Sequence, residues 1–430
     1  MKVFKFGGAS VNSADAVRNM AQIVQTHLES DPLVVVVSAM GKTTNLLEKL
    51  VPGSAGNAPA HELRHQLEDY HRSIASALMP GDNDVQQKIG TLLNSLDTLC
   101  ATLPPDAEHY NYNYDQVVSH GELLSTTIIA HYLNHLGINT QWVDARQVIV
   151  TDHHHREGRV DWEATCAECN LFNDLTKGHQ VALTQGFIAA TSDMKTTTLG
   201  REGSDYSAAI LAYCLNAESV TIWKDVPGFL NADPKFFPDT IKINQIPYDE
   251  AIELAYYGAS VIHPKTVKPI QNKGIPLFIR SFIRPNDDGS VIGNYHTISP
   301  ETPLYIFRND QILLSIYPRD YSFIAEDNLQ VIFGILSKIG IRVNLMQNSA
   351  LSFSICVDNN PQLIGRLTAE LKHLFRVRYN ENLQLITIRY YTQQVIDRIV
   401  ANRPILLEQR SRLTEQLIVP LDKPVTNHGR

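Results

Sequence analysis

The segment that decides the fold is PLVVVVS at residues 32–38, a nearly continuous run of β-branched side chains. A strand that is apolar on both sides is typical of a parallel sheet covered by helices on both faces. The run ends in SAMGKTTN, a loop of small and polar residues that precedes an apolar helical segment. This order of strand, loop and helix predicts an open, mostly parallel α/β sheet sandwiched by helices, with ligands bound at the carboxyl ends of its strands.

The same order extends on both sides of this run. KVFKF at residues 2–6 predicts a first strand, GGAS a turn, and residues 13–29 an amphipathic helix. Residues 60–103 predict a mostly helical insertion, and residues 116–137 a long helix that stops at a glycine. Later strands of this unit are expected within residues 179–190, 219–234 and 274–282, the last of them closing it.

The C-terminal third follows another pattern. The stretch RPNDDGSVIGNYHTISPETP at residues 284–303 is rich in Pro, Gly, Asn and Asp and predicts a linker at residues 284–304, after a catalytic domain at residues 1–283. The β-α-β-β-α-β order expected over residues 305–391 is the ferredoxin-like α+β pattern. Residues 392–430 predict a helix and one or two strands, which fit a shortened second unit of this kind.

Composition excludes several classes of function. The 430 residues carry a formal net charge of −8 and no basic block, which argues against nucleic-acid and anionic-membrane partners. Neither a signal core nor a run of membrane-spanning length is present, so we expect a cytoplasmic protein. The cysteines are odd in number, and the lone pair Cys166 and Cys169 fits a reduced helix face better than a metal or redox site.

Several loops that follow predicted strands carry candidate phosphate-binding residues. Gly7 and Gly8 let backbone N–H groups approach an anion beside the Lys5 cation, although a G-G pair also makes an ordinary turn. The loop WKDVPGFLNADPK at residues 223–235 is a second neighbourhood for phosphates or a nucleotide.

Polar residues at predicted helix starts allow two interpretations. Ser38 and Thr44 either line a pocket or cap the helix that follows. Glu122 either takes part in a site or is a solvated first-turn acid. Three consecutive histidines at residues 153–155 cannot all reach one ion from regular structure, so we expect an exposed loop there and no metal site.

The hinge TTTLGREGSDYSAAILA at residues 196–212 is the most informative of these loops. Ser204 or Asp205 would serve as the N-cap of the helix that follows. Capping leaves Arg201 unexplained, since its planar guanidinium suits bidentate binding of a carboxylate.

In this order, the motifs KFGGAS, SAMGKTTN, GELLST, LGREGSDYSAA, WKDVPG…ADPK and AIELAYYGASVIHPKT resemble the aspartokinase branch of the amino-acid kinase family. The resemblance spans residues 1–283, and the ferredoxin-like tail resembles an ACT regulatory region. It implies transfer of the ATP γ-phosphoryl group to the β-carboxylate of L-aspartate, the entry to lysine, threonine and methionine biosynthesis. Mg²⁺ would arrive with ATP, without a dedicated protein cage, and a homo-oligomer is expected.

The resemblance also assigns roles to individual residues. Lys5 and Asp205 are expected to be catalytic. Residues expected to bind the substrate are Ser38, Ala39, Thr44, Glu122, Phe187, Arg201 and Ser204. Residues expected to bind ATP are Lys5, Gly7, Gly8, Lys224, Asp225, Leu230, Lys235 and Ser260. The usual effector region corresponds to Asn344, Met346, Gln347 and Ser349, where packing or dimerisation is an equally good interpretation.

Some positions depart from the family pattern. Ala9 replaces a usual threonine and Glu202 a usual glycine. On the nucleotide side, Lys224, Leu230, Lys235 and Ser260 stand where relatives carry a threonine, a tyrosine, an arginine and a lysine. Two alternatives to an aspartokinase stay open. One is a related kinase with another acid substrate, and the other, which the changed nucleotide side motivates, is a non-catalytic amino-acid sensor.

Overall fold

The computed structural model describes residues 1–28, 32–54, 59–177, 180–237, 239–259, 261–320 and 322–421. Contacts divide the chain into two units. Unit 1 comprises residues 1–230, 242–255 and 260–300, and unit 2 comprises residues 231–241, 256–259 and 301–430.

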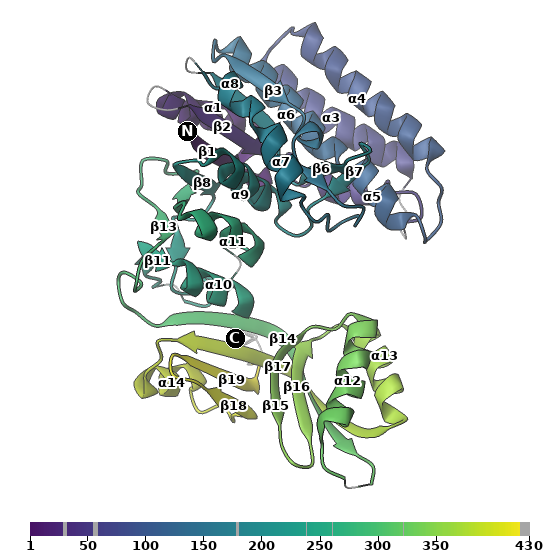
Figure 1. Cartoon of the computed structure of the whole chain (residues 1–430), viewed down its shortest axis with the longest axis vertical. Helices are drawn as coiled ribbons and strands as arrows, with labels where there is room; N and C mark the ends of the chain where they lie inside the picture. Colours follow the sequence, from purple (N-terminus) through teal and green to yellow (C-terminus); the bar gives the residue numbers. More distant parts are fainter. Residues whose placement is uncertain are drawn as a thin grey trace, which may run out of the picture. The chain divides into compact units, whose positions relative to one another are not determined.

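Unit 1 is built on a central sheet (Figure 1). Its strands are ordered β11 (Gln245–Pro247), β13 (Ser290–Gly293), β12 (Leu277–Ser281), β8 (Ser219–Lys224), β1 (Lys2–Phe6), β2 (Leu33–Val37), β5 (Val181–Gln185) and β3 (Thr140–Val143). Neighbouring strands run parallel except for the pair β12 and β13. The predicted mostly parallel sheet is therefore confirmed.

Alternation along β1 sends side chains to the two faces of this sheet. Phe4 and Phe6 join a large core with residues of α1 and α6, whereas Lys5 points to the other face, toward α9. Every residue of β2 is buried, as expected for a strand that helices cover on both faces.

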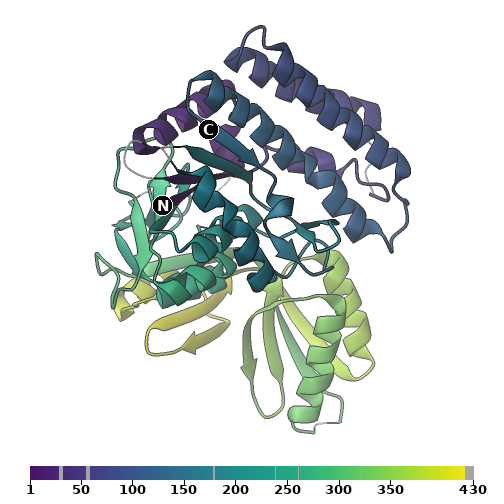
Figure 2. The same ribbon diagram turned by 45° about the horizontal axis from the view of Figure 1, so that its top comes forward.

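Helices flank the sheet along the whole of unit 1. They are α1 (Ala14–Leu28), α2 (Thr43–Glu48), α3 (Ala60–Leu78), α4 (Asn83–Thr102), α5 (Tyr110–Val118), α6 (His120–His135), α7 (Trp162–Cys169), α8 (Leu171–Leu175), α9 (Gly203–Leu215), α10 (Tyr248–Tyr257) and α11 (Pro264–Lys273). Helices α3 and α4, from the expected helical insertion, pack side by side (Figure 2). Their apolar faces join the same core as α1 and α6.

Short strands and 3₁₀ turns complete unit 1. A small sheet has the order β4 (Val150–Thr151), β6 (Ile188–Thr191) and β7 (Thr196–Thr198), and β9 (Phe229–Leu230) pairs with β10 (Lys242–Ile243). The 3₁₀ turns are η1 (Gly8–Val11) and η2 (Ala145–Gln147).

Two sequence-based expectations differ from the structure of unit 1. Residues 290–293, expected within a linker, form β13, so β12 does not close the unit. Ile292 is buried and Val291 is half-buried in this strand, which pairs with β12, and the Pro/Gly-rich surroundings hid it from sequence-based prediction. Cys166 of α7 is bonded to Cys214 of α9, so the expectation of a reduced pair at Cys166 and Cys169 is wrong.

Unit 2 is an antiparallel sheet with helices. Its strands are ordered β15 (Val343–Asn348), β16 (Phe353–Asp358), β14 (Leu304–Pro318), β17 (Phe375–Arg389), β19 (Thr414–Pro420) and β18 (Leu407–Arg410). The helices are α12 (Glu326–Ile339), α13 (Pro361–Lys372) and α14 (Gln393–Val400).

The long strands β14 and β17 are shared by two halves of this sheet. One half combines them with α12, α13, β15 and β16 in the expected β-α-β-β-α-β order, and the other with α14, β18 and β19. A register shift between Arg308 and Gln311 marks the junction. The ACT-like α+β fold is confirmed.

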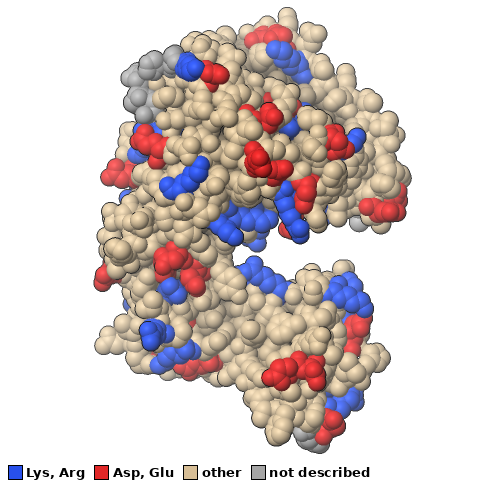
Figure 3. Space-filling model, in the orientation of Figure 1, with Lys and Arg blue, Asp and Glu red and all other residues tan. Residues whose placement is uncertain are grey.

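Acidic and basic side chains are interspersed on the face seen in Figure 3. Within the described part of the chain, no helix combines the length and apolar character needed to cross a bilayer.

Candidate active site

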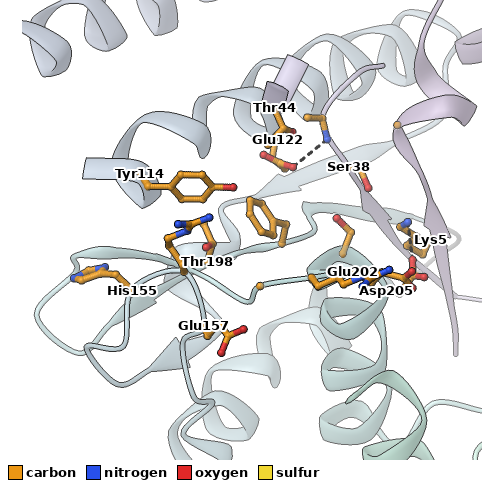
Figure 4. A pocket seen from close by; sticks show the side chains of 18 of the residues that line it. Lys5, Ser38, Thr44, Tyr114, Glu122, His155, Glu157, Thr198, Glu202 and Asp205 are labelled. Carbon is orange, nitrogen blue, oxygen red and sulfur yellow. Dashed lines mark hydrogen bonds and ion pairs between the residues drawn. The ribbon is translucent and has the colours of Figure 1, made fainter. Parts of the chain in front are cut away.

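A cavity of about 900 Å³ opens in unit 1 where β1, β2 and β8 end (Figure 4). Loops after β1 and β2, helices α2, α5 and α6, residues 154–157 and the hinge before α9 supply its walls. This is the carboxyl edge of the parallel strands, where an open α/β sheet binds ligands.

A charged cluster occupies the end of the cavity next to β1. Lys5 Nζ lies 2.6 Å from Asp205 Oδ1, and Lys224 Nζ lies 3.3 Å from Asp205 Oδ2. Burial alone would raise the pKa of Asp205, but the charges of Lys5 and Lys224 hold this pKa below its ordinary value. Asp205 is therefore ionised at neutral pH and fixes two ammonium groups at the cavity.

Gly8 allows the first loop to approach the second. A Cβ atom at Gly8 would lie 2.8 Å from the carbonyl oxygen of Ala39 and 3.0 Å from that of Gly41. A side chain would force these loops apart, so glycine is required here for a steric reason. Gly7 precedes the 3₁₀ turn and does not line the cavity.

Glu122 is a buried carboxyl group in the wall of the cavity, and not a solvated acid. Its Oε1 accepts a hydrogen bond from the amide of Ala39 at 3.2 Å, while its Oε2 has no hydrogen-bond partner among the described residues. Burial raises the pKa of Glu122 to about 8. A buried carboxyl oxygen that lies at a cavity and has no hydrogen-bond partner is suited to bind a cationic group of a ligand.

The hinge before α9 supplies further groups. Helix α9 begins at Gly203 and its N-cap is Glu202, so neither Ser204 nor Asp205 is the cap that the sequence suggested. Both line the cavity together with Arg201. Their positions favour the binding interpretation of the hinge over the capping one.

Strained backbone gathers at this cavity. Arg156, Phe187 and Glu202 have φ angles of 69°, 70° and 52°, and all three residues line it. Residues other than glycine rarely occupy this left-handed region, and such strain clusters at functional sites.

Glu202 therefore does not point into open solvent. Its side chain lies beside Asp205 on the wall of the cavity (Figure 4), and its Oε2 is buried without a hydrogen-bond partner among the described residues. Burial raises the pKa of Glu202, and the charge of Lys224 opposes this rise.

Many of the residues expected in a site meet in this cavity. They are Lys5, Gly8, Ser38, Ala39, Thr44, Glu122, Phe187, Arg201, Ser204, Asp205 and Lys224.

Other expected residues lie elsewhere. Asp225 and Leu230 follow β8 but do not line the cavity, and Lys235 belongs to unit 2. Ser260 lies outside the described residues.

The expected effector residues lie on β15 and the turn after it. Asn344 is engaged within unit 2, since its side chain bonds to Arg308, Gln311 and Asp358. Met346, Gln347 and Ser349 are exposed.

Sequence reasoning missed one wall of the cavity, formed by α5 and the loop after β4. Tyr114, His155 and Arg156 line it, and buried Asp115 stands behind them. The aromatic repeat in YNYNY at residues 110–114 was the signal available, but it does not by itself indicate a site. The three neighbouring histidines contact different carboxylates: His153 contacts Asp193, His154 contacts Asp152 and His155 contacts Asp115.

Known proteins resemble this chain in amino-acid sequence. The sequence model of the Amino acid kinase family matches residues 1–281. Lysine-sensitive aspartokinase 3 of Escherichia coli K12 is 34% identical over 409 residues, covering 90% of this chain and 86% of that protein. The chain belongs to the amino acid kinase family, in its aspartokinase branch.

Family members of known structure agree over both units. The crystal structure of E. coli aspartokinase III with lysine and aspartate matches with a TM-score of 0.81 at 30% identity, covering 98% of this chain and 96% of that one. The same enzyme with aspartate and ADP matches equally well. Aspartokinase 1 of Arabidopsis thaliana is 32% identical over 83% of this chain, which spans 63% of that longer protein.

Proposed function

We propose that the protein transfers the γ-phosphoryl group of ATP to the β-carboxylate of L-aspartate, giving 4-phospho-L-aspartate and ADP. The observation that carries the proposal is the Lys5–Asp205–Lys224 cluster facing Glu122 and Arg201 across one cavity. The relatives resolved with aspartate and ADP support both ligands.

The substrate supplies its own nucleophile. A carboxylate with a pKa of about 4 is ionised at neutral pH, so the enzyme requires no general base. The β-carboxylate oxygen forms a bond to the γ-phosphorus as the bond from that phosphorus to the β,γ-bridging oxygen breaks, and ADP leaves with the bond's electron pair. Catalysis then rests on holding two anions together and on neutralising charge in the transition state.

Each charged residue has a part in that task. Lys5 neutralises the transferring phosphoryl group, and Asp205 orients the Lys5 ammonium. Arg201 binds the α-carboxylate of aspartate through its planar fork. Glu122 accepts the α-ammonium group at its unpartnered Oε2.

Lys224 is the second cation of the nucleotide end. Its ammonium group contacts Asp205 and also donates to the carbonyl of Val261 at 2.5 Å. We propose that it contacts ATP phosphates, together with the amides near Gly8.

Mg²⁺ would enter with ATP. Within the described residues no group of three or more acidic, histidine or cysteine side chains could hold a metal, and Asp205 is engaged by two lysines. The phosphates and water would thus supply most of its ligands, and the ion would neutralise phosphate charge.

We also infer that the protein is a cytoplasmic homo-oligomer that acts in lysine, threonine and methionine biosynthesis. An amino-acid effector would bind at exposed residues of β15. Adding each of these amino acids to the assay below tests the effector, and unchanged rates with all three would remove it.

The proposal is tested by a coupled ADP-release assay with aspartate, glutamate and N-acetylglutamate. Turnover with aspartate is expected, and Lys5→Ala should lower kcat at least ~10³-fold while calorimetry still detects aspartate binding. Turnover with another acid alone would indicate a different kinase. Binding of amino acids without any turnover would indicate a sensor.

A further inference from the structure

Two arginines face the same cavity with their hydrogen-bond donors free. Arg156 and Arg201 both line it, and within the described residues neither guanidinium has a hydrogen bond or an ion pair. Arg201 comes from the hinge before α9, and Arg156 from the loop after β4. A guanidinium that is held in place without an acceptor is suited to bind a planar anion.

The backbone of Arg156 is fixed by a buried carboxylate. The amide of Arg156 donates to Asp115 at 2.9 Å, and the same carboxylate contacts His155 Nδ1 at 2.9 Å and the Thr198 hydroxyl at 2.6 Å. Asp115 has no exposed surface. These bonds fasten the loop to α5 and hold Arg156 at a φ of 69°.

The side chain of Arg156 is positioned by aromatic rings. Its guanidinium lies 4.3 Å from the ring centre of Tyr114 and 5.9 Å from that of Tyr110. The Tyr114 hydroxyl donates to Glu48 at 2.9 Å, which fixes the ring. Stacking on a ring leaves the N–H donors at the guanidinium edge available.

Arg156 lies toward the end of the cavity away from the phosphoryl-transfer cluster. Figure 4 shows Tyr114, on which Arg156 stacks, across the cavity from Lys5 and Asp205, with Glu122 between. An aspartate whose β-carboxylate faces Lys5 directs its α-carboxylate away from Lys5.

We propose that Arg156 is a second arginine for the α-carboxylate of the amino-acid substrate and helps determine specificity for it. The inference rests on the proposed function. Arg156 and Arg201 then hold one carboxylate from two separate loops, which fixes the substrate's orientation before phosphoryl transfer.

The test compares Arg156→Ala and Arg156→Lys with a matched control, Arg159→Ala. Arg159 is an exposed arginine in the same loop that does not line the cavity. Loss of a charge-assisted, bidentate contact predicts a KM for aspartate raised roughly 10- to 100-fold in Arg156→Ala. Arg156→Lys should lie between wild type and alanine, and the KM for ATP should be unchanged in both.

A substrate analogue separates recognition from loop packing. The wild-type enzyme should discriminate strongly between aspartate and its α-amide, which lacks the α-carboxylate charge, and this ratio of kcat/KM values should fall at least ~10-fold in Arg156→Ala. The control variant should keep the wild-type ratio.

Each contrary outcome has a distinct meaning. An unchanged KM and an unchanged discrimination ratio would overturn the role of Arg156. A raised KM with an unchanged ratio would also overturn it, because it would indicate loop packing alone. Absence of aspartate turnover in the wild-type enzyme would instead contradict the proposed function.

Discussion

Glu122 couples the stability of the protein to the binding of its substrate. Its carboxyl group is buried, one oxygen lacks a partner among the described residues, and its pKa is raised to about 8. A group whose folded pKa exceeds its unfolded value binds more protons in the folded state, so stability falls as pH rises from the unfolded pKa through the folded one. An arriving ammonium group would supply the missing partner and favour the ionised form.

Glu122→Gln is expected to stabilise the protein while impairing aspartate binding. Glutamine can still accept from the Ala39 amide but cannot ionise, so its Tm advantage over wild type should grow between pH 5 and pH 8.5. The difference in Tm between variant and wild type should be about 2–4 °C for each kcal/mol that the substitution adds to the free energy of unfolding. Thermal unfolding at several pH values measures it, with exposed Glu62→Gln as the control. Parallel pH profiles for variant and wild type would contradict the prediction.

The same carboxyl group predicts a pH dependence of binding. Because the neutral form predominates below about pH 8, the wild-type KM for aspartate should fall as pH rises from 6.5 to 8.5. Initial rates at saturating ATP measure this. A KM that rises over this range would show that Glu122 does not receive the ammonium group.

Two features of Glu202 destabilise the folded protein. Its backbone is left-handed, and one of its carboxyl oxygens is buried without a hydrogen-bond partner among the described residues. Glu202→Gly should raise the free energy of unfolding by about 1 kcal/mol and lower the KM for ATP, because an acid leaves the nucleotide end. Ala401→Gly, at a φ of 48° in unit 2, relieves backbone strain alone. Chemical denaturation and ATP kinetics test both variants, and a higher KM for ATP would mean that Glu202 assists nucleotide binding.

Prediction from sequence succeeded or failed at individual residues for physical reasons. Lys5 stands in a short motif at the end of β1, and the topology of a parallel sheet brings such strand ends together. Glu122 and Asp205 stand in recognisable motifs in the first turns of α6 and α9. Arg156 could not be found in this way. Its place depends on bonds to Asp115, which lies 41 residues earlier in a helix without a recognisable motif.

At the scale of elements, strong patterns were sufficient. The β-branched run of β2 and the strands of unit 2 were predicted correctly. A strand buried on both faces has a continuous apolar sequence, and a strand buried on one face has alternating apolar and polar residues. Strand β13 was missed because its four residues lie in a segment dominated by turn formers. No local pattern could reveal the bond between α7 and α9, which joins residues 48 positions apart.

The disulfide should stabilise unit 1 by restricting its unfolded chain. Cys214→Ser is expected to lower the free energy of unfolding by about 2–4 kcal/mol under non-reducing conditions. With a reductant present, variant and wild type should unfold together. Cys100→Ser removes a cysteine that is free in the structure and serves as the control. Equal stability of Cys214→Ser and wild type without reductant would contradict the prediction.

At the scale of the whole molecule, the chain enters unit 2 three times. Residues 231–241 and 256–259 belong to unit 2, although unit 1 resumes after each of them. Phe237 stacks on Tyr305 with ring centres 5.1 Å apart, and Ala232 joins the same apolar cluster. The sequence predicted a single domain boundary near residue 284. Composition can indicate a linker, but it does not indicate that short earlier segments of the chain belong to the second unit.

A chain truncated after residue 300 should therefore fold poorly. It keeps Phe236 and Phe237 but loses the strands on which they pack, so we expect aggregation and binding of a hydrophobic dye. Co-expression with residues 301–430 should restore solubility, as sedimentation and dye fluorescence would show. A soluble, monomeric fragment with an unchanged thermal transition would contradict this expectation.

Because unit 2 is built from three separate segments of the chain, its organisation also affects how such a protein can change over evolution. A domain encoded by one continuous stretch of gene can be exchanged by a single recombination event or released by a single protease cut. Unit 2 has no such stretch, since fifteen of its residues are encoded inside the gene segment for unit 1. If residues 301–430 were exchanged as a single segment, the new segment would have to pack on residues 231–241 and 256–259 of the original chain.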